Sequence, residues 1–369
     1  MNNGVVVPYV DLGSQWIDIR DKALPLIDEI LTSGKYLEHG VVTELESKLS
    51  STLGVKHVIT LNSGTDALLM SLYAMGISRG DEVITVPNSF IASVAAIEHI
   101  GATTVFADVG DDHLLNTDKI EGLITSKTKA IMPVHLEGKM CDMQSIHRIA
   151  SKYGLKIIED AAQAFGSKFG ELSPGQNSDV ACFSLHPLKN LNGLGDGGFI
   201  ATNDSSIANR VLKLRNHGQL TRNKSDEFGF VSRLDSIQAA ILLLKLNDFK
   251  EVIAKRRKLA SIYDSLLCGS NVKTPSISPS VFHTYHLYVI EVENREQLQE
   301  LLINHGIETR IHYPIIIPEQ EAFKKKYDGR EEMIPVAMAQ AKRILSLPIH
   351  QNLTEKQVEF VAQILKENT

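Results

Sequence analysis

The sequence predicts an α/β fold, in which a mostly parallel sheet is covered by helices and followed by a smaller α+β domain. Short apolar runs of strand length alternate with helical patterns from residue 55 to residue 210, which is typical of strands joined by crossover helices. The chain has 369 residues, a length that suits about two domains. Near residue 250 the pattern changes to basic amphipathic helix with fewer strands. We therefore predict a large domain at 1–248, a small domain at 249–369, and packing of segment 1–35 near the small domain.

The elements of the large domain follow from the spacing of apolar residues. Positions three or four apart predict helices, and short continuous apolar runs predict buried strands. In chain order the first half is expected to contain helix 16–31, helix 41–53, strand 58–61, helix 67–75, strand 83–86, helix 91–100, strand 103–107, helix 118–124, strand 130–134, helix 143–153 and strand 156–158.

The second half of the chain is read in the same way. Gly, Pro and polar clusters separate the periodic segments and mark turns between them. We expect strand 180–183, strand 199–202, helix 206–214, an exposed polar loop at 219–228, one long helix at 236–267, strand 286–292, helix 295–305, an extended piece at 309–313 and a last helix at 354–367.

Composition excludes several classes of function. Net charge is −6, so the chain has no overall basic field for nucleic acid. No apolar run approaches the roughly 20 residues of a membrane span, and the first residues carry no signal-peptide pattern. Three scattered cysteines (Cys141, Cys182 and Cys268) show no metal-ligand spacing. These features predict a cytoplasmic protein without a metal site.

One lysine is placed where it could react. The apolar run at 180–183 predicts a buried strand, and Ser184, His186 and Lys189 follow it directly. A glycine-rich turn at 193–198 then reverses the chain. An ammonium group is costly to bury, so the pKa of Lys189 should fall and its amine becomes a nucleophile. Lys189 is either an ordinary loop lysine or the residue that forms a Schiff base with pyridoxal phosphate, which further requires a phosphate site, a carboxylate and a face for the ring.

A phosphate site and a ring face are both present as patterns. Strand 58–61 is followed by Ser63, Gly64 and Thr65 and then by a helix, and backbone N–H groups at a helix start attract anions. A simple helix cap is the alternative. Phe90 stands where the next strand ends and a helix begins, at the edge where open α/β sheets bind ligands; a core aromatic residue is the alternative.

The carboxylate is found at the end of the strand at 156–158. Glu159 and Asp160 follow that strand, and strand alternation sends their side chains to opposite faces of the sheet. A buried Asp160 needs a cationic partner, which could be a protonated pyridine nitrogen or an arginine. Gln163 follows three residues later and is near enough to share the site. These residues, with Ser184 as a further phosphate ligand, together predict a pyridoxal phosphate site in which Lys189 and Asp160 are catalytic.

Over essentially its whole length the sequence resembles the DegT/DnrJ/EryC1/StrS sugar aminotransferases. These belong to fold-type I, the aspartate-aminotransferase-like pyridoxal phosphate enzymes, which implies a seven-stranded sheet. The resemblance is carried by seven segments, at residues 63–68, 80–83, 159–163, 183–190, 195–198, 233–240 and 312–314.

The resemblance implies the reaction and its partners. It implies a homodimer with active sites at the subunit interface, L-glutamate or sometimes glutamine as amino donor, and a nucleotide-linked keto-sugar as acceptor. The product would be an amino sugar, as used for lipopolysaccharide O-antigen. Gly-Asp-Gly-Gly at 195–198 is more typical of the 3-amino branch than of the 4-amino branch. Relatives with histidine at the position of Lys189 act as dehydratases, so lysine here favours transamination.

The substrate side is less defined by sequence. His186, close to Lys189, either orients substrate and completes the catalytic set or caps the turn. Candidate substrate-binding residues are Asn190, Arg215, His217, His312 and Tyr313. Arg215 and His217 lie in a cationic loop that either meets the diphosphate or is simply solvated. A sugar dehydratase, a cyclitol aminotransferase and a non-catalytic pyridoxal phosphate sensor remain as alternative functions.

The sequence departs from the family at one position. The family usually has Asn in a Gly-x-Asn-x-Arg segment, where it reaches the phosphate in the partner subunit. Here Val231 occupies that position, and its side chain cannot donate a hydrogen bond. Either Ser232 substitutes for the Asn or the phosphate relies on its own subunit.

Overall fold

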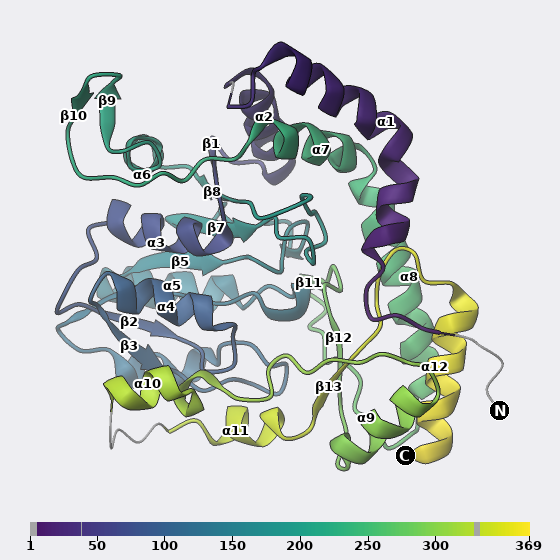
Figure 1. The fold of residues 1–369 in the computed structure, drawn as a ribbon. Coiled ribbons are helices and arrows are strands. Elements are labelled where there is room, and N and C mark those ends of the chain that lie inside the picture. Colours follow the sequence, from purple (N-terminus) through teal and green to yellow (C-terminus); the bar gives the residue numbers. More distant parts are fainter. Residues whose placement is uncertain (1–5, 38, 328–332) are drawn as a thin grey trace.

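The computed structural model describes residues 6–37, 39–327 and 333–369, and a seven-stranded sheet forms its centre (Figure 1). β8 runs antiparallel to both of its neighbours, and the pairs among the other strands are parallel. The predicted mostly parallel, seven-stranded sheet is therefore confirmed. Its spatial order is β1 (His57–Leu61), β8 (Gly198–Thr202), β7 (Val180–Ser184), β5 (Lys156–Asp160), β4 (Thr128–Ile131), β2 (Glu82–Thr85) and β3 (Thr103–Phe106).

Helices bury both faces of this sheet. Alternate strand residues point to opposite faces, so Val83 packs in one hydrophobic cluster and Ile84 in another. The first face is covered by α3 (Gly64–Ala74), α4 (Ile91–His99) and α6 (Ser205–Leu214). The second face is covered by α2 (His39–Leu53), α5 (Met143–Tyr153) and α7 (Ser236–Asn247).

A separate hydrophobic cluster lies in the C-terminal part of the chain, and Val7 from the N-terminal segment joins it. It is built around an antiparallel pair, β12 (Tyr288–Glu291) with β13 (Ile344–Leu347). The helices around it are α8 (Phe249–Leu267), α9 (Arg295–Asn304) and α12 (Glu355–Asn368). α1 (Leu12–Ser33) runs from this region to α7 (Figure 1). On this basis we keep the division at residue 248 as a proposal.

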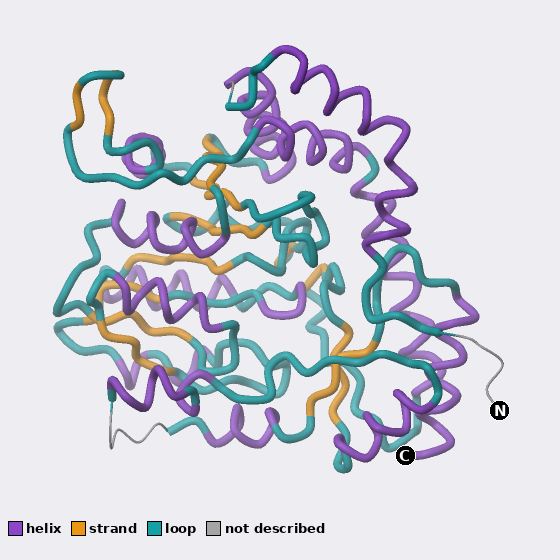
Figure 2. Tube along the Cα trace, viewed as in Figure 1, coloured by secondary structure: helices purple, strands orange, loops and turns teal. Residues whose placement is uncertain are grey.

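Loops and turns join these helices and strands (Figure 2). Several further elements are short. They are β6 (Lys168–Phe169) paired with β11 (Val281–Phe282), the 3₁₀ turns η3 (Leu136–Gly138) and η4 (Ile317–Glu319), and the helices α10 (Glu321–Lys326) and α11 (Pro335–Ala341).

Three sequence predictions about elements were wrong. The single helix expected at 236–267 is two helices, because Asp248 leaves the helical conformation (φ −103, ψ 13) between α7 and α8. The helix expected at 118–124 is two 3₁₀ turns, η1 (Thr117–Lys119) and η2 (Glu121–Leu123). The loop expected at 219–228 contains a small hairpin of β9 (Gln219–Thr221) and β10 (Lys224–Ser225), which projects from the body in Figure 1.

Among the described residues, no helix has both the length and the apolar character needed to cross a membrane. No group of His, Cys, Asp or Glu in that part of the chain is arranged to hold a metal ion.

Candidate active site

A cavity of about 380 Å³ lies where β5 and β7 end and the C-terminal part of the chain packs against them. Eleven of the residues singled out from the sequence line it, although they come from segments far apart in the chain. They are Ser63, Gly64, Thr65, Phe90, Asp160, Gln163, Ser184, His186, Lys189, His312 and Tyr313.

Lys189 lies on a loop that is tied down at several points. Its own backbone N–H donates to His186 O at 2.8 Å, and Gly193 N donates to Leu185 O at 2.8 Å. Asn192 donates to Pro187 O and accepts from Lys245 Nζ at 2.9 Å. Burial lowers the pKa of Lys189 to about 8, and the charge of Asp160 offsets part of that effect. The loop thus presents an amine that is partly neutral near physiological pH, as the sequence led us to expect.

Asp160 is a buried carboxylate that forms no ion pair with a described residue, although the charge of Lys189 acts on it. Its side chain is 5% exposed. Oδ2 accepts from Ser93 Oγ at 2.7 Å, and Oδ1 accepts from Ala162 N at 3.1 Å. No Lys or Arg forms an ion pair with it in the described part of the chain, so the arginine alternative has no support here. A buried anion needs compensation, and a protonated ring nitrogen in the cavity would supply it. Ser93, in the first turn of α4, was not found from the sequence.

Glu159 points to the other face, as strand alternation predicted. His135 Nε2 lies 2.6 Å from Glu159 Oε2, Gly175 N donates to Oε1 at 2.7 Å, and Ser178 Oγ donates to the same oxygen. Because His135 Nδ1 accepts from a backbone N–H, its proton sits on Nε2 and is donated to Glu159. The neighbouring acids of β5 therefore have separate roles, with Glu159 held by the fold and Asp160 facing the cavity.

The start of α3 lies directly against Ser184. A Cβ on Gly64 would be 2.8 Å from Ser184 Cβ, so only glycine allows this close approach. Ser63 caps the helix by accepting from Asp66 N at 3.1 Å, which confirms the capping alternative for that residue. The N–H groups of Gly64 and Thr65 precede the first helical hydrogen bond. They and the Ser184 hydroxyl form a concave site suited to a phosphate.

Phe90, Gln163 and Tyr313 lie together at the cavity. Phe90 is 55% exposed, which excludes the core alternative, and its ring centroid is 5.8 Å from that of Tyr313. Gln163 Oε1 accepts from Glu137 N at 2.6 Å, while Nε2 donates to Tyr313 Oη at 3.4 Å. The Glu137 N–H thus fixes the orientation of the Gln163 amide, so that Nε2 is the atom left to donate on the side of Tyr313 and the cavity.

The C-terminal part of the chain supplies the opposite wall. His312 Nδ1 lies 2.9 Å from Ser346 Oγ, and its ring stacks on Tyr9 with centroids 5.9 Å apart. Burial and then the charge of Lys189 lower the pKa of His312 to about 4, so the imidazole is neutral at physiological pH. Besides Ser93, four further polar residues that line the cavity were not predicted from the sequence, namely Tyr9, Arg256, His286 and His350.

Three predicted substrate residues do not line the cavity. Arg215 is 7% exposed, and its Nη1 donates to Glu46 Oε1 at 2.7 Å and to Thr60 O at 2.8 Å. The expectation that it lies in an exposed loop is wrong, because α2 supplies a buried carboxylate for it. His217 is exposed on the hairpin side and bonds through its backbone to Phe230 O at 2.8 Å. Asn190 Nδ2 donates to Thr284 O at 3.3 Å and is buried behind the loop.

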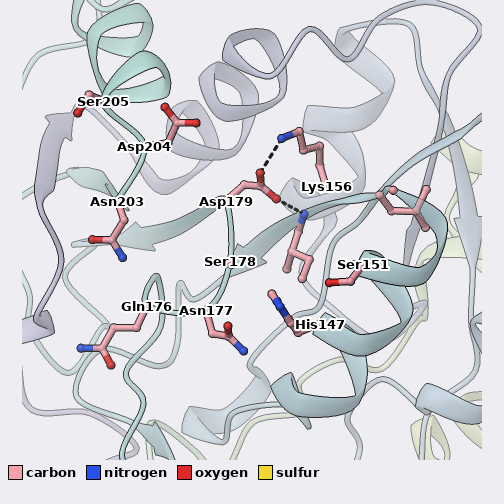
Figure 3. Close-up of a pocket in the computed structure, with 14 residues that line it drawn as sticks. His147, Ser151, Lys156, Gln176, Asn177, Ser178, Asp179, Asn203, Asp204 and Ser205 are labelled. Carbon is pink, nitrogen blue, oxygen red and sulfur yellow. Dashed lines mark hydrogen bonds and ion pairs between the residues drawn. The ribbon is translucent and has the colours of Figure 1, made fainter.

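A second hollow lies at the amino end of β5, and Lys156, Asp179 and Asp204 are among the residues that line it (Figure 3). Lys156 Nζ donates to Asp179 Oδ1 at 2.8 Å there, and Asp179 Oδ2 accepts from Ile157 N at 2.8 Å. Asp204 also lines the hollow and caps α6 by accepting from Ser206 N at 2.7 Å. Since these carboxylates have partners and none of the candidate residues lines the hollow, we assign no chemistry to it.

The cavity residues fit pyridoxal phosphate. Asp160 is a buried anion without an ion-pair partner among the described residues, Gly64 lets Ser184 lie close to the helix start, and Lys189 offers an amine of lowered pKa. Bound there, the cofactor would supply an electron sink at its ring and an aldehyde carbon for covalent chemistry.

Comparison with known proteins gives a consistent result. The sequence model of the DegT/DnrJ/EryC1/StrS aminotransferase family matches residues 18–366. A protein described as a pleiotropic regulatory protein, from Geobacillus stearothermophilus, is 37% identical over 98% of both chains. A UDP-2-acetamido-2-deoxy-3-oxo-D-glucuronate aminotransferase from Pseudomonas aeruginosa is 38% identical over 98% of this chain and 99% of the relative.

Solved structures agree with the fold. S. venezuelae DesV, in complex with a ketimine intermediate, superposes with a TM-score of 0.96 at 35% identity, covering 99% of this chain and 98% of that one. NtdA from Bacillus subtilis, with its bound cofactor PMP, has a TM-score of 0.90 at 32% identity over 99% of this chain and 87% of that one.

Proposed function

The chain belongs to the DegT/DnrJ/EryC1/StrS aminotransferase family, and we propose that it moves the amino group of L-glutamate to a nucleotide-linked keto-deoxysugar. It is an aminotransferase that uses pyridoxal phosphate. The observation that supports the proposal best is the convergence of Lys189, Asp160 and the start of α3 on one cavity.

We assign the following roles. Lys189 Nζ is the nucleophile that holds the cofactor and, once displaced, the base that takes a proton from the donor's α-carbon. Asp160, fixed by Ser93 and Ala162, keeps the ring nitrogen protonated. Gly64 and Thr65, with Ser184, hold the phosphate. Phe90 covers one face of the ring, and Gln163 lies near the ring hydroxyl. His186, whose Nδ1 accepts from Leu188 N at 3.2 Å, orients substrate at the mouth of the cavity.

We propose a 3-keto rather than a 4-keto acceptor. Two observations support this choice. Gly195, Asp196, Gly197 and Gly198 form the Gly-Asp-Gly-Gly segment, and the Pseudomonas aeruginosa relative is named for a 3-oxo sugar nucleotide. His312 and Tyr313, on the wall opposite Lys189, are the residues that we expect to contact the sugar. The product would serve as an amino sugar for a cell-surface polysaccharide such as O-antigen, made in the cytoplasm.

A second candidate function is a pyridoxal phosphate sensor without turnover. It is favoured by the name of the Geobacillus stearothermophilus relative, a pleiotropic regulatory protein. Against it, a sensor needs no amine of lowered pKa beside an uncompensated carboxylate, and Lys189 and Asp160 provide both. Dehydratase and cyclitol aminotransferase activities share this cavity chemistry and are distinguished by the substrate test below.

The first test is an absorbance spectrum of the purified protein before and after L-glutamate. We expect a band near 410 nm, roughly where bound pyridoxal phosphate absorbs, and its replacement by a pyridoxamine-like band as 2-oxoglutarate appears. Nucleotide 3-keto-sugars, 4-keto-sugars and cyclitol ketones are then added in turn, and restoration of the first band identifies the acceptor. A spectrum that does not change with L-glutamate, L-glutamine or other amino acids would contradict the aminotransferase proposal. Loss of sugar without any donor would indicate a dehydratase.

We further propose that the protein is a homodimer whose interface includes the β9–β10 hairpin. Leu220 is 50% exposed on that hairpin, and in the segment that follows it Phe228 is fully exposed and Val231 is 53% exposed. Ser232 cannot serve a partner's phosphate, since it is buried and its hydroxyl accepts from Asn62 N at 3.2 Å. With Val231 apolar, we assign the phosphate to residues of its own subunit.

The dimer proposal predicts that Phe228→Asp weakens association. A charge placed in an apolar interface is left without compensation, so the dimer should dissociate at concentrations where wild type does not. Analytical ultracentrifugation should give about twice the chain mass of 40.7 kDa for wild type and a lower average mass for the variant. Exposed Tyr153→Phe, on α5, is the control. A wild-type monomer, or an unchanged Phe228→Asp dimer, would refute this interface.

A further inference from the structure

One wall of the cavity contains several polar atoms that are buried and unsatisfied. Tyr9 Oη, Arg256 Nε, His286 Nδ1 and His350 Nδ1 all lack a hydrogen-bond partner among the described residues, and all four residues line the cavity. Burial raises the pKa of Tyr9, and the nearby Ser346 hydroxyl, which forms no hydrogen bond of normal geometry with Tyr9 Oη, offsets only part of that rise. Since buried polar groups in proteins are nearly always paired, four unpaired atoms at one wall indicate that a ligand group completes them.

Arg256 gives this wall its charge. The side chain is 5% exposed and extends from α8. Nη1 donates to Tyr285 O at 3.0 Å and to Ile349 O at 2.8 Å, and Nη2 donates to Gln351 Oε1 at 3.3 Å. All three acceptors are neutral, and no carboxylate forms an ion pair with Arg256 in the described part of the chain. Burial lowers its pKa to about 10, so the guanidinium remains charged at neutral pH and lacks a counter-ion.

The histidines around Arg256 are neutral. Burial lowers the pKa of His286 well below its usual value, and the charges of Lys189 and Arg256 lower it further. Burial also lowers the pKa of His350 to about 4, with Arg256 again contributing. A neutral imidazole can donate or accept a hydrogen bond. The wall therefore combines one buried positive charge with side chains that can bind either an anion or a hydroxyl group.

From this arrangement we propose that the wall formed by Tyr9, Arg256, His286 and His350 is the subsite for the carboxylate attached to the reacting carbon of the amino donor. The inference rests on the proposed function and names the group that this wall recognises. His286, Arg256 and Lys189 line the same cavity, so the subsite and the reacting amine face the same space. The group next to the reacting carbon is a carboxylate in an amino acid, and an anion there compensates Arg256.

The same wall suits the second half of the reaction. A keto-sugar places ring hydroxyl groups, which are neutral, beside its reacting carbon. Tyr9 and the neutral histidines can form hydrogen bonds with hydroxyl groups. A wall of several exposed arginines would suit a neutral group less well, because the arginines would lose their hydration without gaining an anion. A diphosphate is a poorer fit, because it carries more charge than one buried guanidinium compensates.

Tyr9→Phe tests the subsite cleanly. It removes one oxygen atom that forms no hydrogen bond of normal geometry with the described residues, so the melting temperature should not fall, whereas Arg256 cannot be replaced without freeing three acceptors. The probe is glutarate, which resembles the donor but lacks the amino group, and its neutral diamide is the matched compound. Binding to the cofactor-loaded protein is measured by calorimetry at constant ionic strength, with Tyr153→Phe as control.

We expect wild type and Tyr153→Phe to bind glutarate and to bind the diamide far more weakly. Tyr9→Phe should bind glutarate about 10-fold more weakly, the effect of losing one hydrogen bond to a charged group, and its KM for L-glutamate should rise in parallel. Equal glutarate binding by wild type and Tyr9→Phe, or equal binding of the diamide and glutarate, would overturn the subsite. The spectral change of wild type with L-glutamate is scored separately, so failure of the subsite leaves the aminotransferase proposal intact.

Discussion

Lys189→Ala is expected to lower the rate of amino transfer by at least about 1,000-fold, because one side chain supplies both the nucleophile and the proton carrier. Lys189 has the properties that both tasks require, since its pKa is about 8 and its loop is fixed by Asn192 and Lys245. The variant should fold normally, because Lys189 Nζ makes no hydrogen bond to a described residue and its removal relieves the cost of burying a charge. Stopped-flow absorbance after mixing with L-glutamate measures the first half-reaction directly, and added methylamine should restore part of the rate.

Lys245 provides a matched control for this variant. Burial lowers its pKa to about 8 as well, but it donates to Asn192 O at 3.0 Å behind the loop and does not line the cavity. Lys245→Ala should therefore lose some thermal stability and keep activity of the same order as wild type. If Lys189→Ala turned over normally, the assignment of the nucleophile would be wrong. If both variants lost activity equally, loop structure rather than the amine would explain the loss.

The parts of the site that the sequence predicted are those fixed by local geometry. A strand of period two places Glu159 and Asp160 on opposite faces whatever the rest of the chain does. A strand, a small-residue turn and a helix start can offer an anion site within a few residues, and Gly64 and Thr65 stand at such a helix start. Lys189 follows a buried strand directly, so its partial burial could be anticipated from the sequence alone.

The parts that the sequence missed depend on how distant segments pack. Tyr9 and Arg256 reach the cavity only because the N-terminal segment and α8 pack against the same core, and no local motif surrounds either residue. Arg215 was misplaced for the same reason, since its partner Glu46 lies on α2. Ser93 was missed because a serine in the first turn of a helix normally indicates a cap. The break between α7 and α8 at Asp248 was not predicted, because apolar residues continue at helical spacing on both sides of it.

Asp160→Asn is expected to lower the rate by at least about 100-fold, the usual effect of removing one preorganised charge from an active site. A neutral amide cannot keep the ring nitrogen of the cofactor protonated, so the variant lacks the carboxylate that would stabilise a proton on that nitrogen. The substitution is isosteric and should be accepted by the fold. Asn Oδ1 can accept from Ala162 N, and Ser93 Oγ, which already lies 3.3 Å from Phe90 O, can turn its proton there and accept from the amide.

The neighbouring acid makes this prediction specific. Glu159 accepts from His135, Gly175 N and Ser178. The NH2 group of a glutamine at this position would face one of these donors, which should lower the free energy of unfolding by about 1–3 kcal/mol. Glu159→Gln should therefore lower the melting temperature and leave the rate nearly unchanged. Asp160→Asn should do the reverse, with the melting temperature of the cofactor-free protein equal to wild type or higher, because an uncompensated buried charge is removed. Measuring kcat and melting temperature for both variants separates the two roles. An active Asp160→Asn, or a Glu159→Gln that loses more activity than stability, would mean that the cavity acid had been assigned to the wrong residue.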